Sequence, residues 1–420
     1  MKNIQAIRGM HDVLPDEIGY WKALERILFT IAEQYGYQEI RFPLIEFTEL
    51  FSRSIGEGTD VVEKEMYTFV DRSSDSLTLR PEGTASCIRA GIEHGMLHNQ
   101  IQRFFYYGPM FRHERPQKGR YRQFHQFGVE AYGMAGPAID LEMILMAMRF
   151  WQDLGIEHKV ILQINTLGDC DSRLEYRQHL VDYFYRNYGL LDGDGIRRLN
   201  SNPLRLLDSK NPRLKDVIDG APKILDYLNS DSREHFDQLV SMLKQLEIPH
   251  VINPHLVRGL DYYNSTVFEW VVLDQKELSQ NSICAGGHYD SLVANLGGRE
   301  TSAIGFALGM ERLLALVGEE LSSPSCNLIY LVTLGKRAIV SGMQFVQDLR
   351  CKLGKKILVD CQGGDLKSQL RRANKSGAEI VLILGDNELD RGEIIVKYIK
   401  GAWEQRVVKL DELISGSYCI

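Results

Sequence analysis

A basic segment in the first third of the chain has the composition of an anion-binding loop. Between Phe111 and Gln123 it carries five cationic side chains and one acid, which are Arg112, Arg115, Lys118, Arg120 and Arg122 with Glu114. Arginine suits phosphates because its guanidinium group donates two parallel hydrogen bonds. Residues 123–130, directly after the loop, add an aromatic face and further polar groups. A basic surface loop on a hairpin is the simpler alternative, and this segment alone leaves it open.

Two later segments place charged side chains beside glycine. Residues 258–263 read Arg-Gly-Leu-Asp-Tyr-Tyr, and residues 303–312 read Ala-Ile-Gly-Phe-Ala-Leu-Gly-Met-Glu-Arg. Glycine at a strand-to-helix joint permits close approach to the backbone, and Arg312 would then emerge in the first helical turn. Taken singly, each segment also fits a structural role, either a turn with two core tyrosines or an ordinary glycine pair.

The common phosphate and hydrolase motifs are absent. The sequence has no G-x-x-x-x-G-K-[ST] loop, no G-x-G-x-x-G after a strand, no H-E-x-x-H and no G-x-S-x-G. If ATP is a substrate, its phosphates must therefore be held by side chains such as the arginines above.

Periodicity indicates the elements that would position these groups. Apolar residues at helical spacing predict helices over 21–35 and 139–154, and residues 37–43, 77–80, 103–111, 124–132, 160–167, 267–273 and 303–308 have strand character. The strands over 37–132 and 255–308 lack regular alternation with helices. The sequence therefore predicts an α+β fold, an antiparallel sheet with flanking helices, rather than a Rossmann fold.

Two regions depart from this pattern. Residues 170–250 are polar and helical in period, which indicates a helical insertion. After Pro324, strands over 328–334, 356–359 and 379–384 alternate with helices, one over 366–376, as in a small α/β module. We expect a catalytic core at 1–326, with the insertion at about 170–250, and a separate α/β domain at 327–420.

Composition bounds the environment and the partners. The net charge is −7, but residues 327–420 hold 15 basic and 11 acidic side chains, a balance of +4 against −11 for the rest. A basic end on an acidic body suits a local polyanion contact, although chance variation is the simpler reading of charge alone. Seven cysteines without a C-x-x-C pair argue for reduced thiols and against a disulfide framework or a thiolate zinc site, and we expect no protein-bound metal. With no apolar run of membrane length and no signal-like start, we expect a cytoplasmic protein.

Taken together, these segments resemble the class II aminoacyl-tRNA synthetases, and specifically the histidyl-tRNA synthetase family. Residues 111–130 and 303–312 resemble motifs 2 and 3 of the class, and residues 37–43 resemble motif 1, which lies at a dimer interface. Arg258–Asn264 and Ala285–Asp290 resemble the two histidine signatures, and Leu79–Thr84 resembles the amino-acid loop. The resemblance runs from Arg8 into the C-terminal module. It implies the class II fold with a C-terminal anticodon-binding domain.

The resemblance also implies the reaction and its partners. Histidine and ATP would form histidyl-adenylate with release of pyrophosphate, and the histidyl group would pass to the 3′ end of tRNA(His). The expected partners are L-histidine, ATP with Mg²⁺, tRNA(His) and a second copy of the chain, without a membrane. The catalytic residues would be Arg258 and Arg112.

Individual binding roles follow from the same resemblance. ATP would contact Arg112 at the α-phosphate, Glu114 at the adenine edge, Phe124 on the base and Arg312 at the γ-phosphate. Histidine would contact Glu82, Gly83, Thr84, Arg112, Gln126, Glu130, Arg258, Tyr262 and Tyr263, with Glu130 and Tyr263 on the imidazole nitrogens. Arg115 and Gln117 would meet the tRNA acceptor end.

One signature residue departs from the family. The usual Ala-Gly-Gly-Arg-Tyr-Asp has His288 in place of arginine, and Ser291 replaces a usual glycine. Either the ring of His288 packs neutral in a turn, or its protonated form supplies the usual positive charge. We expect the neutral ring, because Arg112, Arg258 and Arg312 already provide cations.

Two other functions share parts of this sequence pattern. A paralogous regulatory subunit of ATP phosphoribosyltransferase has the same core and binds histidine without catalysis, but usually lacks the anticodon domain. A generic RNA-binding protein with an inactive core is the second alternative. The complete arginine set and the module after Pro324 favour the synthetase over both.

Overall fold

The computed structural model of the protein describes residues 3–56, 59–209, 211–274, 281–318, 321, 328–399 and 405–418. The chain divides into two compact units, 1–323 and 324–420. The expected boundary at 326/327 lies outside the described residues. The five described cysteines, Cys87, Cys170, Cys284, Cys351 and Cys361, are free. Within the described part of the chain, no helix is both long and apolar enough to cross a membrane.

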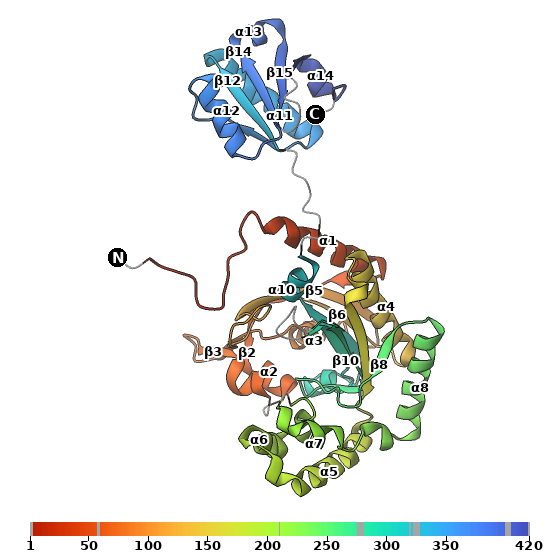
Figure 1. Cartoon of the computed structure of the whole chain (residues 1–420). Helices are drawn as coiled ribbons and strands as arrows, with labels where there is room; N and C mark the ends of the chain where they lie inside the picture. Colours follow the sequence, from red (N-terminus) through yellow and green to blue (C-terminus); the bar gives the residue numbers. More distant parts are fainter. Residues whose placement is uncertain are drawn as a thin grey trace. The chain divides into compact units, whose positions relative to one another are not determined.

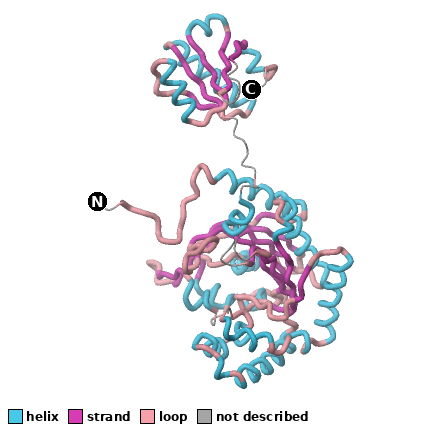
Figure 2. The backbone as a smooth tube through the Cα atoms, viewed as in Figure 1, coloured by secondary structure: helices cyan, strands magenta, loops and turns pink. Residues whose placement is uncertain are grey.

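The first unit is built on a mixed sheet that is mostly antiparallel (Figures 1 and 2). Among the described residues its strand order is β1-β5-β6-β11-β10-β9-β7-β8, and only the outer pairs β1–β5 and β7–β8 are parallel. The strands are β1 (Gln38–Glu39), β5 (Gln102–Phe111), β6 (Gln123–Tyr132), β7 (Val160–Thr166), β8 (His250–Ile252), β9 (Asn264–Val272), β10 (Ser282–His288) and β11 (Ala303–Gly309).

Strand periodicity sorts the side chains onto the two faces of this sheet. Successive residues of a strand point to opposite sides. In β5, Phe105 joins the apolar core on one face, while Phe104 and Tyr106 join a second core on the other. The first face is covered by helices α1 (Ile18–Gln34), α4 (Pro137–Asp153), α8 (Ser230–Gln245) and α10 (Met310–Val317).

The second face carries shorter elements. Helices α3 (Thr84–Glu93) and α9 (Leu292–Asn295) pack against it. A small three-stranded sheet with the order β2-β4-β3 lies beside α2 and the one-turn helix η1. These elements are β2 (Ile45–Phe47), β3 (Tyr67–Val70), β4 (Ser76–Leu79), α2 (Thr48–Ile55) and η1 (Val61–Glu65).

The region expected to be a helical insertion is helical in the structure (Figure 1), and it has its own apolar core. Its longer helices begin at side chains that accept a hydrogen bond from a backbone N–H of the first turn, as N-caps do. These caps are Asp169, Asp192 and Asn229. Besides α8, the helices are α5 (Cys170–Arg186), α6 (Gly193–Ser201), α7 (Lys215–Asp219) and the one-turn helices η3 (Tyr188–Leu190), η4 (Pro203–Leu206), η5 (Pro212–Leu214) and η6 (Ile224–Asp226).

The second unit is an α/β domain. Its described sheet has the order β13-β12-β14-β15-β16, with the first three strands parallel. The strands are β12 (Ile329–Leu334), β13 (Ile357–Val359), β14 (Ile380–Gly385), β15 (Glu393–Tyr398) and β16 (Gln405–Lys409). The helices are α11 (Lys336–Leu353), α12 (Leu366–Lys375), α13 (Asp386–Arg391) and α14 (Leu410–Ser415). The expected α+β class with a C-terminal α/β domain is confirmed.

Candidate active site

A cavity of about 520 Å³ opens on the second face of the large sheet. Because side chains alternate along β6, Phe124 and Gln126 both point into it, while Phe127 and Val129 join the core on the other face. Ten of the residues selected from the sequence line this cavity, namely Glu82, Thr84, Arg112, Glu114, Phe124, Gln126, Arg258, Tyr262, Tyr263 and Arg312. Segments far apart in the chain therefore meet in one place.

The other four selected residues do not line the cavity. Glu130 lies just behind the wall at Gly305, where an added Cβ would come within 1.8 Å of the Glu130 carboxylate. Gly83 begins α3 against the ring of Tyr106. Arg115 and Gln117 are exposed on the loop between β5 and β6.

Guanidinium groups gather at one end of the cavity. Arg112 donates from Nε to the Pro81 carbonyl at 2.8 Å and lies over the ring of Phe124. Arg312 donates from Nε to the Gly119 carbonyl at 3.1 Å and from Nη1 to the Ser282 carbonyl at 2.9 Å. Burial, followed by the charges of Arg112 and Arg120, lowers the pKa of Arg312 to about 10. A bound polyanion would reduce the repulsion between these positive charges.

The loop also contains an ion pair that bears on the adenine assignment. Glu114, expected at the adenine edge, pairs with the guanidinium of Arg120. Arg120 in turn forms a small backbone bridge with Gln117, with N···O distances of 2.9 Å in both directions. In this structure Glu114 therefore helps to shape the loop.

Arg258 lines the cavity, and its side chain is 14% exposed. Its Nη1 donates to Glu269 Oε1 at 2.7 Å, and its guanidinium carbon lies 5.3 Å from the centre of the Tyr263 ring. The Nε atom is buried without a hydrogen-bond partner. Burial opposes the charge of Arg258, but Glu269 leads the contacts that raise its pKa overall, so the side chain stays cationic.

Two buried carboxyl groups, Glu82 on the cavity wall and Glu130 behind it, lie near each other. Glu82 accepts hydrogen bonds from the backbone N–H groups of Thr84 and Ala85, each at 2.8 Å, at the start of α3. Glu130 accepts from the Thr84 hydroxyl at 2.7 Å and from the Tyr289 hydroxyl. Burial above all raises the pKa of Glu130 to about 8, and the charge of Glu82 raises it further. An incoming cationic group would stabilise both carboxylates.

Three functional contacts do not follow from the sequence pattern. Tyr289 holds Glu130, Glu269 holds Arg258, and Glu311 accepts from the His125 backbone N–H at 2.8 Å. Tyr289 and Glu311 stand inside the family motifs, next to the residues that received roles. Glu269 lies in a strand whose pattern carries no separate signal. Glu269 is in β9 and Arg258 lies between β8 and β9, so their contact depends on how the chain folds back and not on the sequence pattern of either segment.

The expectation that His288 packs as a neutral ring is wrong. The ring is buried, and its Nε2 lies 2.5 Å from Asp140 Oδ1. Burial lowers the pKa of His288, but the charge of Asp140 and then that of Asp290 raise it more, to about 10. His288 is therefore an imidazolium that supplies the positive charge of the usual arginine. Asp140, far away in sequence, gave no hint of this pairing.

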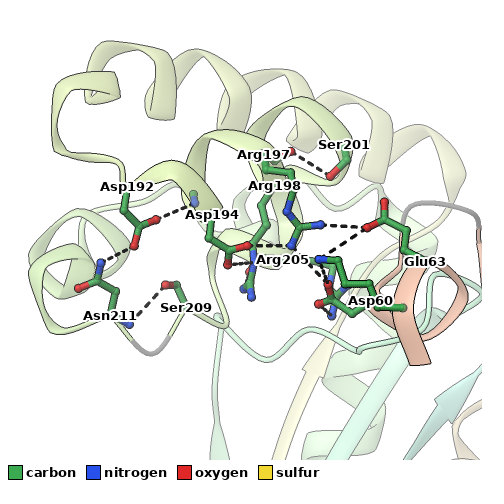
Figure 3. A network of polar contacts seen from close by, with 12 residues as sticks. Asp60, Glu63, Asp192, Asp194, Arg197, Arg198, Ser201, Arg205, Ser209 and Asn211 are labelled. Atoms are coloured by element: carbon green, nitrogen blue, oxygen red, sulfur yellow. Dashed lines mark hydrogen bonds and ion pairs between the residues drawn. The ribbon is translucent and has the colours of Figure 1, made fainter. Parts of the chain in front are cut away.

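The insertion contributes one wall of the cavity and is tied to η1. Figure 3 shows Arg197 and Arg205 pointing toward Asp60. Arg197 lies 3.3 Å from Asp60 and 3.1 Å from Glu63, and Arg205 lies 3.3 Å from Asp60. Since Asp60 and Arg205 both line the cavity, these ion pairs close it on the side of the insertion.

Comparison with known proteins agrees with this architecture. Residues 9–313 match the family model for histidyl-tRNA synthetase, and residues 329–416 match that for an anticodon binding domain. A crystal structure of apo histidyl-tRNA synthetase from S. aureus is 36% identical, with a TM-score of 0.82 and 99% of each chain covered.

More distant structures share the fold. A histidyl-tRNA synthetase from a Nostoc species is 17% identical, with a TM-score of 0.69 over 99% of each chain. A Bacillus halodurans protein described as an ATP phosphoribosyltransferase regulatory subunit/histidyl-tRNA synthetase is 19% identical, with a TM-score of 0.64 over 92% of this chain and all of that one.

The antiparallel sheet, its arginine-lined cavity and the anticodon-binding domain define a class II aminoacyl-tRNA synthetase. Within that class, the chain belongs to the histidyl-tRNA synthetase family. It is a histidine–tRNA ligase, and the general class II reaction proceeds by activation and then transfer.

Proposed function

We propose that the 520 Å³ cavity is where this chain activates histidine with ATP. The observation that carries the proposal is the presence of two sets of charged groups at one cavity, the cations Arg112 and Arg312 and the buried carboxyl groups of Glu82, on its wall, and Glu130, behind it. A triphosphate fits the first set and an amino acid with a cationic head fits the second. Their reacting groups would then meet beside Arg258.

Among the cations, Arg312 would hold the γ-phosphate and Arg112 the α-phosphate, with the base on Phe124 and its edge at Glu114. Mg²⁺ would enter with ATP, since it prefers phosphate and carboxylate oxygens. Glu269 and Glu311 are the cavity carboxylates whose charges act on Arg312, and they are suitable protein groups to approach that ion.

Near the carboxyl groups, Glu82 and Thr84 would bind the α-ammonium group of histidine beside the Gly83 backbone. Glu130 and Tyr263 would bind the two imidazole nitrogens, with Gln126 and Tyr262 adjacent. A pocket with a polar partner for each nitrogen discriminates well, because an isostere leaves buried groups unpaired.

In the first step a carboxylate oxygen of histidine would attack the α-phosphorus, and the bond to pyrophosphate would break. Both reactants are anionic, so the permanent charges of Arg258 and Arg112 would lower the barrier as charge builds on the α-phosphate. The unpartnered Nε of Arg258 is a donor available for this contact.

The tRNA contacts would lie outside the cavity. Arg115 and Gln117 are exposed on the loop next to it and would meet the acceptor end of tRNA(His). The C-terminal unit would read the anticodon through splayed single-stranded bases.

We also propose a homodimer that works in the cytoplasm. The three-stranded sheet exposes large apolar side chains, namely Ile45, Phe47, Phe69 and Val70. Such a patch marks an interaction surface, and it lies near the segment that resembles the dimer motif.

Glu130→Gln tests the histidine pocket. The variant keeps the volume of the side chain but removes the acid, so kcat/KM for histidine in ATP–pyrophosphate exchange should fall by roughly 10²-fold. The KM for ATP should hardly change. Glu234→Gln, which alters an exposed contact with Gln238, is the matched control. An unchanged KM for histidine in Glu130→Gln would remove Glu130 from the pocket.

A further inference from the structure

The register of β9 and β10 breaks immediately beside the two cavity tyrosines. Gly287 pairs with Val267, but the next residue, His288, pairs with Asn264. Ser265, inside this bulge, has a left-handed backbone with φ of 47°, which is uncommon for a residue other than glycine. Bulges next to active sites re-aim side chains. Here the bulge follows directly on Tyr262 and Tyr263.

One buried carboxylate binds both strands of the bulge. Asp140, at the start of α4, accepts a hydrogen bond from the Thr266 hydroxyl of β9 at 2.6 Å. It also contacts His288 Nε2 of β10 at 2.5 Å and His235 Nε2 of α8 at 2.7 Å. The Asp140 side chain is fully buried. The two imidazole rings and the hydroxyl therefore occupy both of its oxygens.

A second carboxylate completes the arrangement on the side of Asn264. Asp290 accepts from Asn264 Nδ2 at 2.9 Å, and the Asp290 backbone N–H donates to Asn264 Oδ1 at 3.0 Å. Oδ1 of Asp290 also lies 3.3 Å from His288 Nδ1. His288 thus bridges two acids and stands opposite the residue that follows Tyr263.

A bound metal is not required to explain this cluster. Among the described residues, the ligand atoms of Asp140, His235 and His288 lie within 4.8 Å of one another. The N···O separations of 2.5 and 2.7 Å are hydrogen-bond distances. They are shorter than the roughly 3.3 Å between ligands set tetrahedrally at about 2 Å from a zinc ion.

We propose that Asp140, held by His288 and His235, pins the β9–β10 bulge and thereby positions Tyr262 and Tyr263 for histidine. The inference rests on the proposed contact between Tyr263 and the imidazole of the substrate. Asp140, His288 and His235 are positioning residues that do not touch the substrate. In this chain His288 with His235 performs the task for which the family signature carries arginine.

The pH dependence of the pin follows from the groups that face it. His288 faces Asp140 of α4, His235 of α8, Thr266 of β9 and Asp290 beyond β10. Its pKa is raised in the folded chain to about 10, so the contribution of its charge is complete below its ordinary pKa and is lost as pH rises through about 10. The charged contact between His288 and Asp140 should therefore persist throughout the neutral pH range.

The test is histidine-dependent pyrophosphate exchange by the full chain. We expect His288→Gln to raise the KM for histidine about tenfold, the scale of a weakened buried charge contact, with kcat and the KM for ATP within about twofold. Thr266→Val should raise the KM for histidine less than His288→Gln does, and His288→Arg should keep that KM near the wild-type value. His250→Gln, which alters a ring contact to a local carbonyl, is the matched control, and melting temperatures identify unfolded variants.

A second readout is the ratio of histidine KM values for the wild type and His288→Arg. The wild-type KM divided by that of His288→Arg should stay constant from about pH 6.5 to 9 and rise as the pH approaches 10. Near that pH the side chain of His288 loses its charge, whereas an arginine at position 288 keeps it. A normal KM in a folded His288→Gln, a fall in kcat alone, or a ratio that changes near pH 6.5 would overturn the proposal. Tyr263→Phe separates the two claims, since an unchanged KM in that variant refutes the tyrosine assignment itself.

Discussion

At the scale of single residues, the cavity and its wall bring together ionisable groups whose pKa values are shifted by burial and by neighbouring charges. Arg258 has a buried, unpartnered Nε, and Arg312 has a lowered pKa among other guanidinium groups. Glu130 has a raised pKa beside a second carboxyl group. Such perturbed groups cluster at functional sites, and here each sign of charge is poised for a ligand of the opposite sign.

Arg258→Ala should slow adenylate formation mainly through kcat. Its proposed contact strengthens as charge builds on the α-phosphate, so loss of about 10²-fold or more is expected. Transfer from preformed adenylate should suffer less. Single-turnover assays of the two steps measure this, with Arg149→Ala, an exposed ion-pair partner of Asp153, as control. Equal damage to both steps would assign Arg258 a structural role.

The residues of β6 show how much of the site the sequence can predict at this scale. Alternation along a strand predicts that Phe124, Gln126 and Glu130 share one face, and the structure places them on the same side of β6. The state of His288 does not follow from its own strand in the same way. It depends on Asp140 and His235, which are distant in sequence and meet it only through the packing of α4 and α8.

At the scale of elements, the loop between β5 and β6 has one side toward the cavity and one toward solvent. Arg112 and Arg120 turn into the cavity, whereas Arg115 and Gln117 face solvent. In the proposed function, ATP contacts one side of the loop and tRNA the other.

Arg115→Ala should accordingly leave pyrophosphate exchange near the wild-type level. Aminoacylation should weaken by several-fold to tenfold through the KM for tRNA, because one phosphate or base contact is lost. The two assays run on one preparation make the comparison. If exchange falls as much as charging, the loop side chain supports the cavity and does not serve the tRNA alone.

Several elements followed from the sequence, short ones among them, since the strands predicted over 77–80 and 356–359 overlap β4 and β13. The helix predicted over 21–35 is α1, and the strands predicted over 103–111 and 124–132 are β5 and β6. The strand predicted over 37–43 is correct only at Gln38–Glu39. The edge strands β8 and β16 have no counterpart among the predicted strands.

At the scale of the whole molecule, the two units have separate apolar cores. The cores of residues 328–420 and those of the first unit share no members among the described residues. Separate cores permit separate folding, and the proposed chemistry lies entirely in the first unit.

A chain ending at Ser323 should therefore keep histidine activation within a few-fold while charging tRNA poorly. The lost unit carries the anticodon-binding match, so the KM for tRNA should rise by at least about tenfold. Normal tRNA charging by the shortened protein would show that anticodon reading lies elsewhere. Loss of exchange as well would mean that the second unit is needed for the catalytic unit to fold or associate.

The most direct measurement of the central claim is ATP–pyrophosphate exchange by the full chain with each of the twenty amino acids. In the proposed assignment, Glu130 and Tyr263 contact the two nitrogens of the imidazole, so histidine alone should support exchange. Isosteres without those nitrogens should be at least about 10³-fold poorer, because they leave buried polar groups unpaired. Equal exchange with a second amino acid, or exchange that survives loss of both Glu130 and Tyr263, would contradict the account.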